Sequence, residues 1–206
     1  MRGGSGGRAI MSLGNIESRV TVGINDEGAN MIGFTAALWI ALQAAGAVPA
    51  PEAEMLEAPL PSGFKIGFAD KQSGQTIEER VPVRETVEAW SRMITVQRFS
   101  GLARIGPHAM LEKLGSLMIQ ACPGAIADPI EDASDGGHVT AAFRVTCPLN
   151  PATGKPETML ARAFAGDADI HLVQYAYRAI PSPKEASAAT AYLGSVRLKS
   201  GSSSGK

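Results

Sequence analysis

The chain has 206 residues, of which 45% are hydrophobic and 19% are charged, and its formal net charge is −1. This length and composition predict one globular domain with a sizeable core and exclude a wholly disordered chain. The near-neutral charge argues against a nucleic-acid-binding surface, and an aromatic content of 5% leaves few side chains for stacking on sugars or bases.

The first 50 residues divide into two segments of different character. Residues 1–30 carry Gly, Ser and charges without periodicity, and we expect a disordered leader or a segment absent from the mature protein. Residues 31–50, MIGFTAALWIALQAAGAVPA, contain no charged residue and resemble the hydrophobic and cleavage regions of a secretory signal peptide. Two positions in this segment are candidate signal-peptide cleavage sites, one after Ala47 and one after Ala50.

The residues before Met31 weaken the signal-peptide interpretation. Asp26 and Glu27 stand where a signal peptide carries positive charge, unless translation begins at Met31. Two alternatives therefore remain open, an uncleaved membrane anchor and a buried helix of the domain. Residues 51–62, with several Pro and Glu residues, are predicted to be a linker.

The folded part is predicted to begin with a hairpin. Apolar residues alternate along the chain from Phe64 and again over Gln75–Val83, which predicts two strands. The intervening Lys71–Gly74 favours a turn between them. In the second strand Ile77, Glu79, Val81 and Val83 share one face.

A short helix and a third strand are expected next. Val87, Trp90 and Ile94 follow one another at helical spacing, which predicts a short helix with Trp90 as a core anchor. Met93–Phe99 is then predicted to be a strand, and residues 100–106 are predicted to be a loop.

The clearest helix opens at Pro107 and stops before Pro123-Gly124. Its apolar residues form a single stripe. They are Met110, Leu111, Leu114, Leu117, Met118 and Ala121.

The second half of the chain is predicted to consist mostly of strands. They are expected over Ala125–Glu131, His138–Cys147, Thr158–Ala165 and Ile170–Ala179, with a tight turn at Asp135-Gly136. A final helix opens at Ser182, which is followed by Pro183 and Glu185 in a capping pattern, and residues 199–206 form a flexible tail. The order predicts an α+β domain over residues 63–198, an antiparallel sheet covered on one face by two main helices and one short helix.

Cys122 and Cys147 are the only cysteines. One ends the predicted helix and the other ends a strand on its core-facing side. In an oxidising compartment they are a natural disulfide pair, whereas in the cytosol they would be two buried thiols. Their spacing excludes a catalytic C-x-x-C motif.

No pattern of metal-ligating or nucleophilic residues is present. The three histidines are far apart, and the acidic stretch around Asp128, Glu131 and Asp132 fails the calcium-loop pattern, so no metal and no cofactor are predicted. Gly154-Lys155 lacks the rest of a phosphate loop, and there is no G-x-S-x-G elbow. Weak catalytic candidates remain, assembled from distant positions. They are His138, Asp135, Arg144 and His171.

Four phrases carry a resemblance to a known group of proteins: VPVRETVEAWSRMITVQRF, CPGA, CPLNPATGKPETM and ATAYLGSVRL. Together they resemble uncharacterised exported proteins of proteobacteria, over roughly residues 62–198, and the resemblance implies secretion. The order of elements also resembles the Mog1/PsbP-like fold, whose members are mostly accessory or binding proteins. Fold alone does not fix function, and no catalytic residue is carried over.

These observations favour a non-catalytic accessory or binding protein of the cell envelope, periplasmic or secreted. Its partner would be an envelope protein or a small ligand. Nucleic acid is not expected as a partner, and a membrane would be contacted only through residues 31–50 if they are not cleaved. Two alternatives stay open, a small exported hydrolase and an intracellular partner-binding domain.

Overall fold

The computed structural model describes residues 54–200. The expected leader (1–30), the signal-like segment (31–50) and residues 201–206 of the tail lie outside the described residues. Within the described part, no helix is long and apolar enough to cross a membrane.

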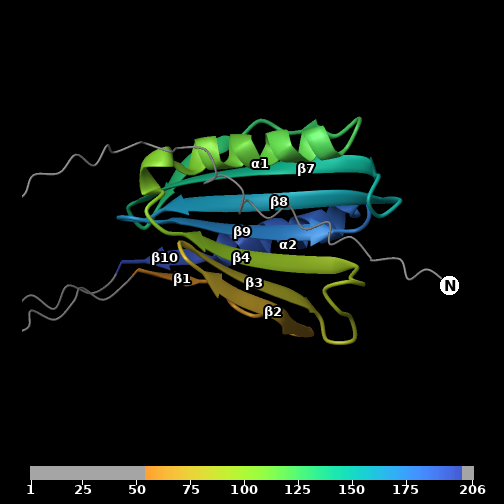
Figure 1. The fold of residues 1–206 in the computed structure, drawn as a ribbon, viewed down its shortest axis with the longest axis horizontal. Helices are drawn as coiled ribbons and strands as arrows, with labels where there is room; N and C mark the ends of the chain where they lie inside the picture. Colours follow the sequence, from red (N-terminus) through yellow and green to blue (C-terminus); the bar gives the residue numbers. More distant parts are fainter. Residues whose placement is uncertain (1–53, 201–206) are drawn as a thin grey trace, which may run out of the picture.

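One large antiparallel sheet dominates the domain, and its strands run in the order β2-β3-β4-β9-β8-β7-β5, with β6 also paired to β7 (Figure 1). Its strands are β2 (Phe64–Gln72), β3 (Gln75–Pro82), β4 (Arg92–Phe99), β5 (Ile126–Ala127), β6 (Glu131–Asp135), β7 (His138–Asn150), β8 (Lys155–Ala165) and β9 (Ile170–Tyr177). A separate small ribbon pairs β1 (Met55–Glu57) with β10 (Arg197–Lys199). The α+β class and the single domain expected from the sequence are confirmed.

Two helices cover the sheet, and they lie on opposite faces of it. Helix α1 (Pro107–Ala121) packs on β7 and β8, in a core that includes Ala161 and Ala163. Helix α2 (Pro183–Ser195) packs on the other face, in a core that includes Leu160 and Phe164. The expectation that the helices share one face is therefore wrong.

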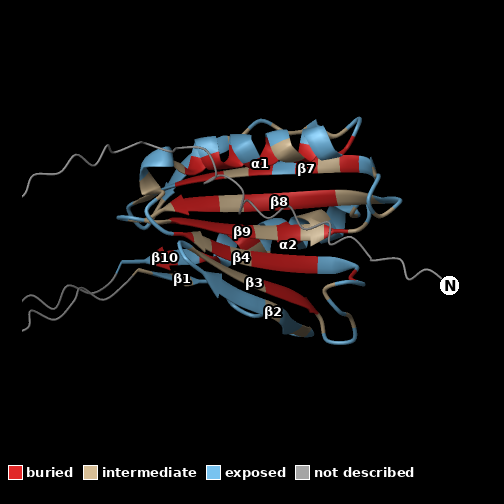
Figure 2. Ribbon diagram, viewed as in Figure 1, coloured by how far each residue is buried: buried red, intermediate tan, exposed pale blue. Residues whose placement is uncertain are grey.

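The composition of β8 explains this difference. Successive side chains of a strand point to opposite faces, and in β8 both sets are buried (Figure 2). A strand whose side chains are buried on both faces needs a cover on each.

The short helix expected around Trp90 is not formed. Residues 84–91 form a turn followed by bends and irregular backbone, and the short helical element is instead a 3-10 turn at Ala103–Ile105. Trp90 is nevertheless a core anchor, buried with Val81 and Met93. The segment joins two neighbouring antiparallel strands, β3 and β4, so the chain has to turn back within it.

The segment expected as one strand over Ala125–Glu131 is broken in two. Pro129 lacks an N–H and interrupts the pairing, so that β5 and β6 each pair separately with β7. The β6–β7 hairpin turns at Gly136-Gly137, one residue later than expected, with positive φ values of 60° and 89°. Such values suit a tight two-residue hairpin and favour glycine.

The capping pattern at the start of α2 is confirmed. The Ser182 Oγ accepts a hydrogen bond from the Glu185 backbone N–H at 3.3 Å, and the Glu185 carboxylate accepts one from the Ser182 N–H at 2.8 Å. Pro183 occupies the first turn, where its missing N–H costs nothing.

Candidate functional site

A groove lies on the α1 side of the sheet, over the strands that α1 does not cover. Because α1 packs on β7 and β8, the same face of β3, β4 and β9 is left to form the floor of a cavity of about 330 Å³. Its walls are the loop before β4, the end of α1 and the β7–β8 hairpin. The lining residues are Ile77, Glu79, Trp90, Met93, Thr95, Gln97, Met118, Ala121, Cys122, Asn150, Pro151, Ala152, Glu157, Gln174 and Ala176.

The floor of the groove is unusually polar for the interior of a sheet. Glu79, Thr95 and Gln97 are all buried, and the Gln174 Nε2 donates to the Gln97 Oε1 at 2.8 Å. Burying such groups costs free energy unless they are hydrogen-bonded, and a core built only for packing would place apolar residues here. A concave, mainly apolar cavity with a few convergent polar groups is the usual form of a ligand site.

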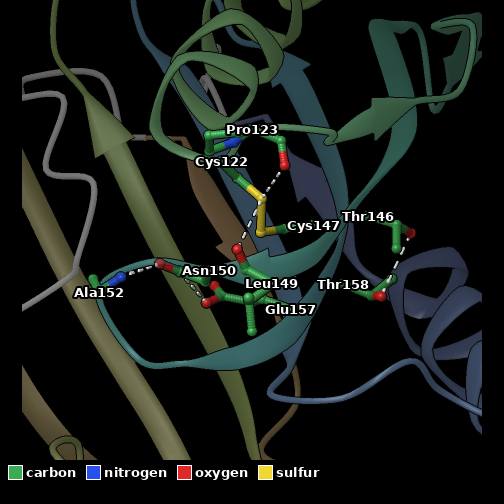
Figure 3. Close-up of a disulfide and its surroundings, with 9 residues drawn as sticks. All are labelled: Cys122, Pro123, Thr146, Cys147, Leu149, Asn150, Ala152, Glu157 and Thr158. Carbon is green, nitrogen blue, oxygen red and sulfur yellow. Dashed lines mark hydrogen bonds between the residues drawn. A yellow bond between two sulfur atoms is a disulfide. The ribbon is translucent and has the colours of Figure 1, made fainter.

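The hairpin wall of the groove carries a second carboxyl group. The Asn150 Nδ2 donates to the Glu157 Oε2 at 2.9 Å, while the Asn150 Oδ1 accepts from the Ala152 N–H at 3.0 Å (Figure 3). Burial raises the pKa of Glu157 above its ordinary value, and the Asn150 hydrogen bond and the charge of Arg178 only partly oppose this.

The opposite wall is formed by Trp90, whose position is fixed by Arg178. The Arg178 guanidinium lies 4.2 Å from the centre of the indole ring and donates to the Glu88 carbonyl at 3.1 Å. This stacking holds the indole ring in place from behind, where a cation over an aromatic face is attractive.

The cysteine pair connects two walls of the groove. Cys122 ends α1 and Cys147 lies in β7, just before the hairpin, with their Cα atoms 5.9 Å apart and their sulfur atoms at bonding distance (Figure 3). The pairing suggested by the sequence therefore has the geometry of a disulfide, and both cysteines are buried. It ties the end of α1 to the strand that leads into Asn150.

Three of the four catalytic candidates come together, but on the other face of the sheet. His138, Asp135 and His171 lie near one end of the α2 side. The His138 Nδ1 donates to the Ala165 carbonyl at 3.2 Å, and its Nε2 lies 3.3 Å from the Ser200 hydroxyl. His171 is buried in β9.

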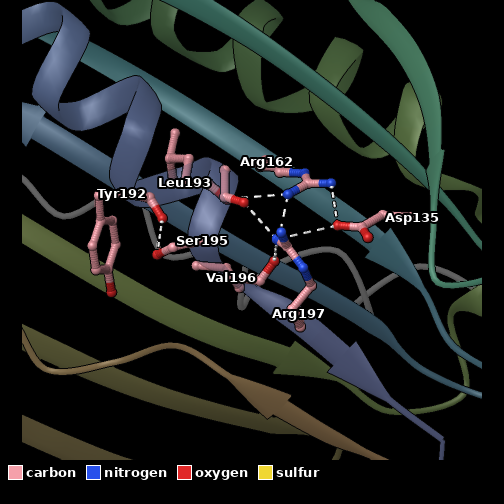
Figure 4. Close-up of polar contacts among 8 residues, drawn as sticks. Asp135, Arg162, Tyr192, Leu193, Ser195, Val196 and Arg197 are labelled. Atoms are coloured by element: carbon pink, nitrogen blue, oxygen red, sulfur yellow. Dashed lines mark hydrogen bonds and ion pairs between the residues drawn. The ribbon is translucent and has the colours of Figure 1, made fainter.

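Asp135 is engaged by two arginines that hold the end of α2. The Arg162 Nη2 lies 2.8 Å from the Asp135 carboxylate, and Arg197 lies 3.4 Å from the same oxygen (Figure 4). Arg162 also donates to the carbonyls of Leu193 and Val196 at 3.1 and 3.4 Å. These contacts bind carbonyls at the C-terminal end of α2, which is a structural role.

The fourth candidate, Arg144, is separate and exposed. Its Nη2 pairs with the Asp128 carboxylate at 2.7 Å, and about half of each side chain is open to solvent. No feature of this arrangement assigns a reaction to the four residues, and their catalytic role stays a prediction. Among residues 54–200, no three His, Cys, Asp or Glu side chains are grouped so as to hold a metal ion.

The groove residues were not among the candidates taken from the sequence. One signal was present, because Glu79 shares a face with Ile77 and Val81 in its strand, and a carboxyl on a core-facing side is unusual. Gln97, Gln174 and Glu157 gave no such signal, because their common cavity exists only after β4, β9 and the hairpin have come together.

Burial of His171 predicts a pH dependence of stability. Its pKa is lowered from 6.5 mainly by burial, with Arg98 and His138 adding to the effect and Asp169 opposing it. Below about pH 6.5 the unfolded chain binds a proton that the folded chain does not, so the free energy of unfolding should fall as the pH drops, by up to about 1.4 kcal/mol per pH unit. Urea unfolding at pH 7.5, 6.5 and 5.5 measures this slope.

The His171→Gln variant should have a flatter slope over this range than the wild-type protein. His108→Gln is the control, because His108 is exposed and pairs with Asp132 at the surface. Equal slopes in the His171→Gln variant and the wild type would contradict the prediction.

No protein-family model and no curated protein matches the sequence. Solved structures with a similar fold include the cyanobacterial PsbP (CyanoP) of Synechocystis sp. PCC 6803, at 10% identity and a TM-score of 0.42 over 77% of this chain and 99% of that one. The Ran-binding protein Mog1p of Saccharomyces cerevisiae is 13% identical, with a TM-score of 0.42 over 68% of this chain and 82% of that one.

A third similar structure is LpqN, a protein of Mycobacterium tuberculosis involved in cell envelope biogenesis. It is 11% identical, with a TM-score of 0.43 over 74% of this chain and 87% of that one. The solved structures with a similar fold thus include the Mog1 and PsbP structures that the order of elements led us to expect. At this identity and TM-score the likeness supports no statement about function.

Proposed function

We propose that this protein is an exported binding protein of the cell envelope and that the groove beside α1 holds a small ligand. The observation that carries the proposal is the polar floor of that groove, where Glu79, Thr95 and Gln97 are buried beneath an apolar cavity. A volume of about 330 Å³ falls within the range of small-molecule sites.

Two features support export. Residues 31–50 resemble a signal peptide. The Cys122–Cys147 pair has the geometry of a disulfide, and disulfide bonds persist in oxidising compartments. The intact mass of protein recovered from its native host tests this part. We expect loss of the chain through Ala47 or Ala50 and a gain of two hydrogens on reduction, whereas a full-length mass with two free thiols would contradict export.

Binding is favoured over catalysis by the chemistry of the lining. Among residues 54–200, the lining side chains include no His, Lys or Ser, and Cys122 is paired with Cys147. No Ser–His or Cys–His pair therefore lines the described part of the groove, and such a pair is the usual machinery of acyl transfer.

A small exported hydrolase remains as a second candidate because of one observation. Glu79 and Glu157 both line the groove, and a pair of carboxyl groups in one cavity is what acid-base hydrolysis of a glycoside requires. Hydrolysis of nitrophenyl glycosides that is lost in Glu157→Gln would favour this candidate over a binding protein.

Ligand binding in the groove is tested with N-phenyl-1-naphthylamine, an uncharged dye whose fluorescence rises in apolar surroundings. We expect the oxidised protein to enhance its fluorescence and the Ala121→Phe variant to weaken binding severalfold, since Ala121 lines the groove at the end of α1. Gln120→Phe is the matched control, because Gln120 is the neighbouring exposed residue and does not line the cavity. No enhancement, or equal loss in both variants, would contradict binding at this site.

A further inference from the structure

The ionisable side chains that line the groove are all carboxylic acids. Glu79 lies on the floor and Glu157 on the hairpin wall, and the described lining contains no Lys, Arg or His. Arg178 acts on Glu157 electrostatically, but its guanidinium is held over the Trp90 ring and bonded to the Glu88 carbonyl, and Arg178 does not line the cavity.

The hydrogen bonds within the groove leave an acceptor available on Glu157. Its Oε2 accepts from Asn150, but no described residue donates to its Oε1. An ionised carboxylate can accept several hydrogen bonds, so this oxygen can accept one from a ligand.

The remainder of the lining is suited to an apolar body. Met93 and Met118 line the cavity from β4 and α1, and Ala176 lines it from β9, where it is paired with Met93. Thioether side chains adapt to irregular shapes, which suits a flexible hydrocarbon more than a rigid polar molecule.

We propose that the ligand of this groove is a small molecule with an apolar body and a positively charged amino group, which donates to the Glu157 carboxylate. The inference rests on the proposed function, because it assigns a chemical class to the occupant of the same groove. The apolar body would lie on Met93, Met118 and Ala176.

The physical reason lies in the cost of burying Glu157. Burial raises the pKa of this carboxyl because its charged form is poorly solvated. An ammonium group in hydrogen-bonding distance stabilises the ionised form, and charge-assisted hydrogen bonds are about twice as strong as neutral ones.

The test compares three probes with the same hydrocarbon chain, hexylammonium, hexanol and hexanoate, by NMR titration of the full ¹⁵N-labelled, oxidised chain at pH 7.5. We expect hexylammonium to shift the amides of groove residues with an affinity at least about tenfold above that of hexanol, and hexanoate to bind most weakly. Glu157→Gln should remove the preference for the amine. The Asn150 amide can still donate to the new side chain, which favours correct folding of this variant.

Glu112→Gln is the matched control, because Glu112 is an exposed carboxyl on α1 outside the groove, and this variant should keep the preference. Equal affinities for the three probes, or a preference for hexanoate, would overturn the amine assignment. If N-phenyl-1-naphthylamine still binds in that case, the groove remains a binding site for another class of ligand. Absence of groove shifts with every probe, together with no dye binding, would overturn both proposals.

Discussion

Replacing Cys122 and Cys147 together by serine is expected to lower the free energy of unfolding by at least about 3–4 kcal/mol, compared with the oxidised wild type. The two residues are 25 apart in sequence, and in the chain-entropy model a link across a loop of this size stabilises the folded state by about that amount. Both sites are buried, so two serine hydroxyls in place of the sulfurs add to the loss. Urea unfolding of the two proteins measures the difference.

The control for this prediction is reduction of the wild-type protein. A dithiol reductant should move the wild type toward the stability of the double variant and leave the double variant unchanged. Stability that is the same in oxidised wild type, reduced wild type and double variant would contradict the prediction. Because the same link joins α1 to the hairpin side of the groove, the double variant should also bind N-phenyl-1-naphthylamine more weakly.

Replacing Arg162 by methionine is expected to lower the free energy of unfolding by about 2–4 kcal/mol. The Arg162 side chain is 14% exposed and its partner Asp135 is 23% exposed, so the substitution removes one partner of a largely buried ion pair. It also removes the donor to the Leu193 and Val196 carbonyls and the cation that lies 4.6 Å from the centre of the Phe164 ring. Arg197 still neutralises Asp135 in part, which keeps the loss below that of a fully buried pair.

Arg144→Met provides a matched comparison for this substitution. Arg144 lies on the same face of the sheet and also pairs with an aspartate, but its side chain is 48% exposed and that of Asp128 is 43% exposed. An exposed pair contributes at most about 1 kcal/mol, so this variant should unfold close to the wild type. Equal losses in the two variants would show that burial does not decide the contribution of Arg162.

The sequence itself determined the elements whose signals are local. The two helices could be predicted from the apolar stripe over Met110–Met118 and from the cap at Ser182. Helical spacing and capping involve only residues that are close in sequence. The alternation in β7 placed Phe143 and Cys147 in the core, as the structure has them, although Val139 at the strand's start is exposed. The pairing of the two cysteines was predicted from the same alternation, because Cys147 lies on the core-facing side of that strand.

Only the tertiary structure decided which surfaces meet. Helical spacing around Trp90 was outweighed by the need to return from β3 to β4, so that segment became a turn. The placement of α1 and α2 on opposite faces depends on both faces of β8 being buried, and the sequence of each helix contains no information about which face it covers. The groove also depends on this packing. Glu79 and Glu157 come from separate hairpins, and they line one cavity only because α1 leaves this face of β3, β4 and β9 uncovered.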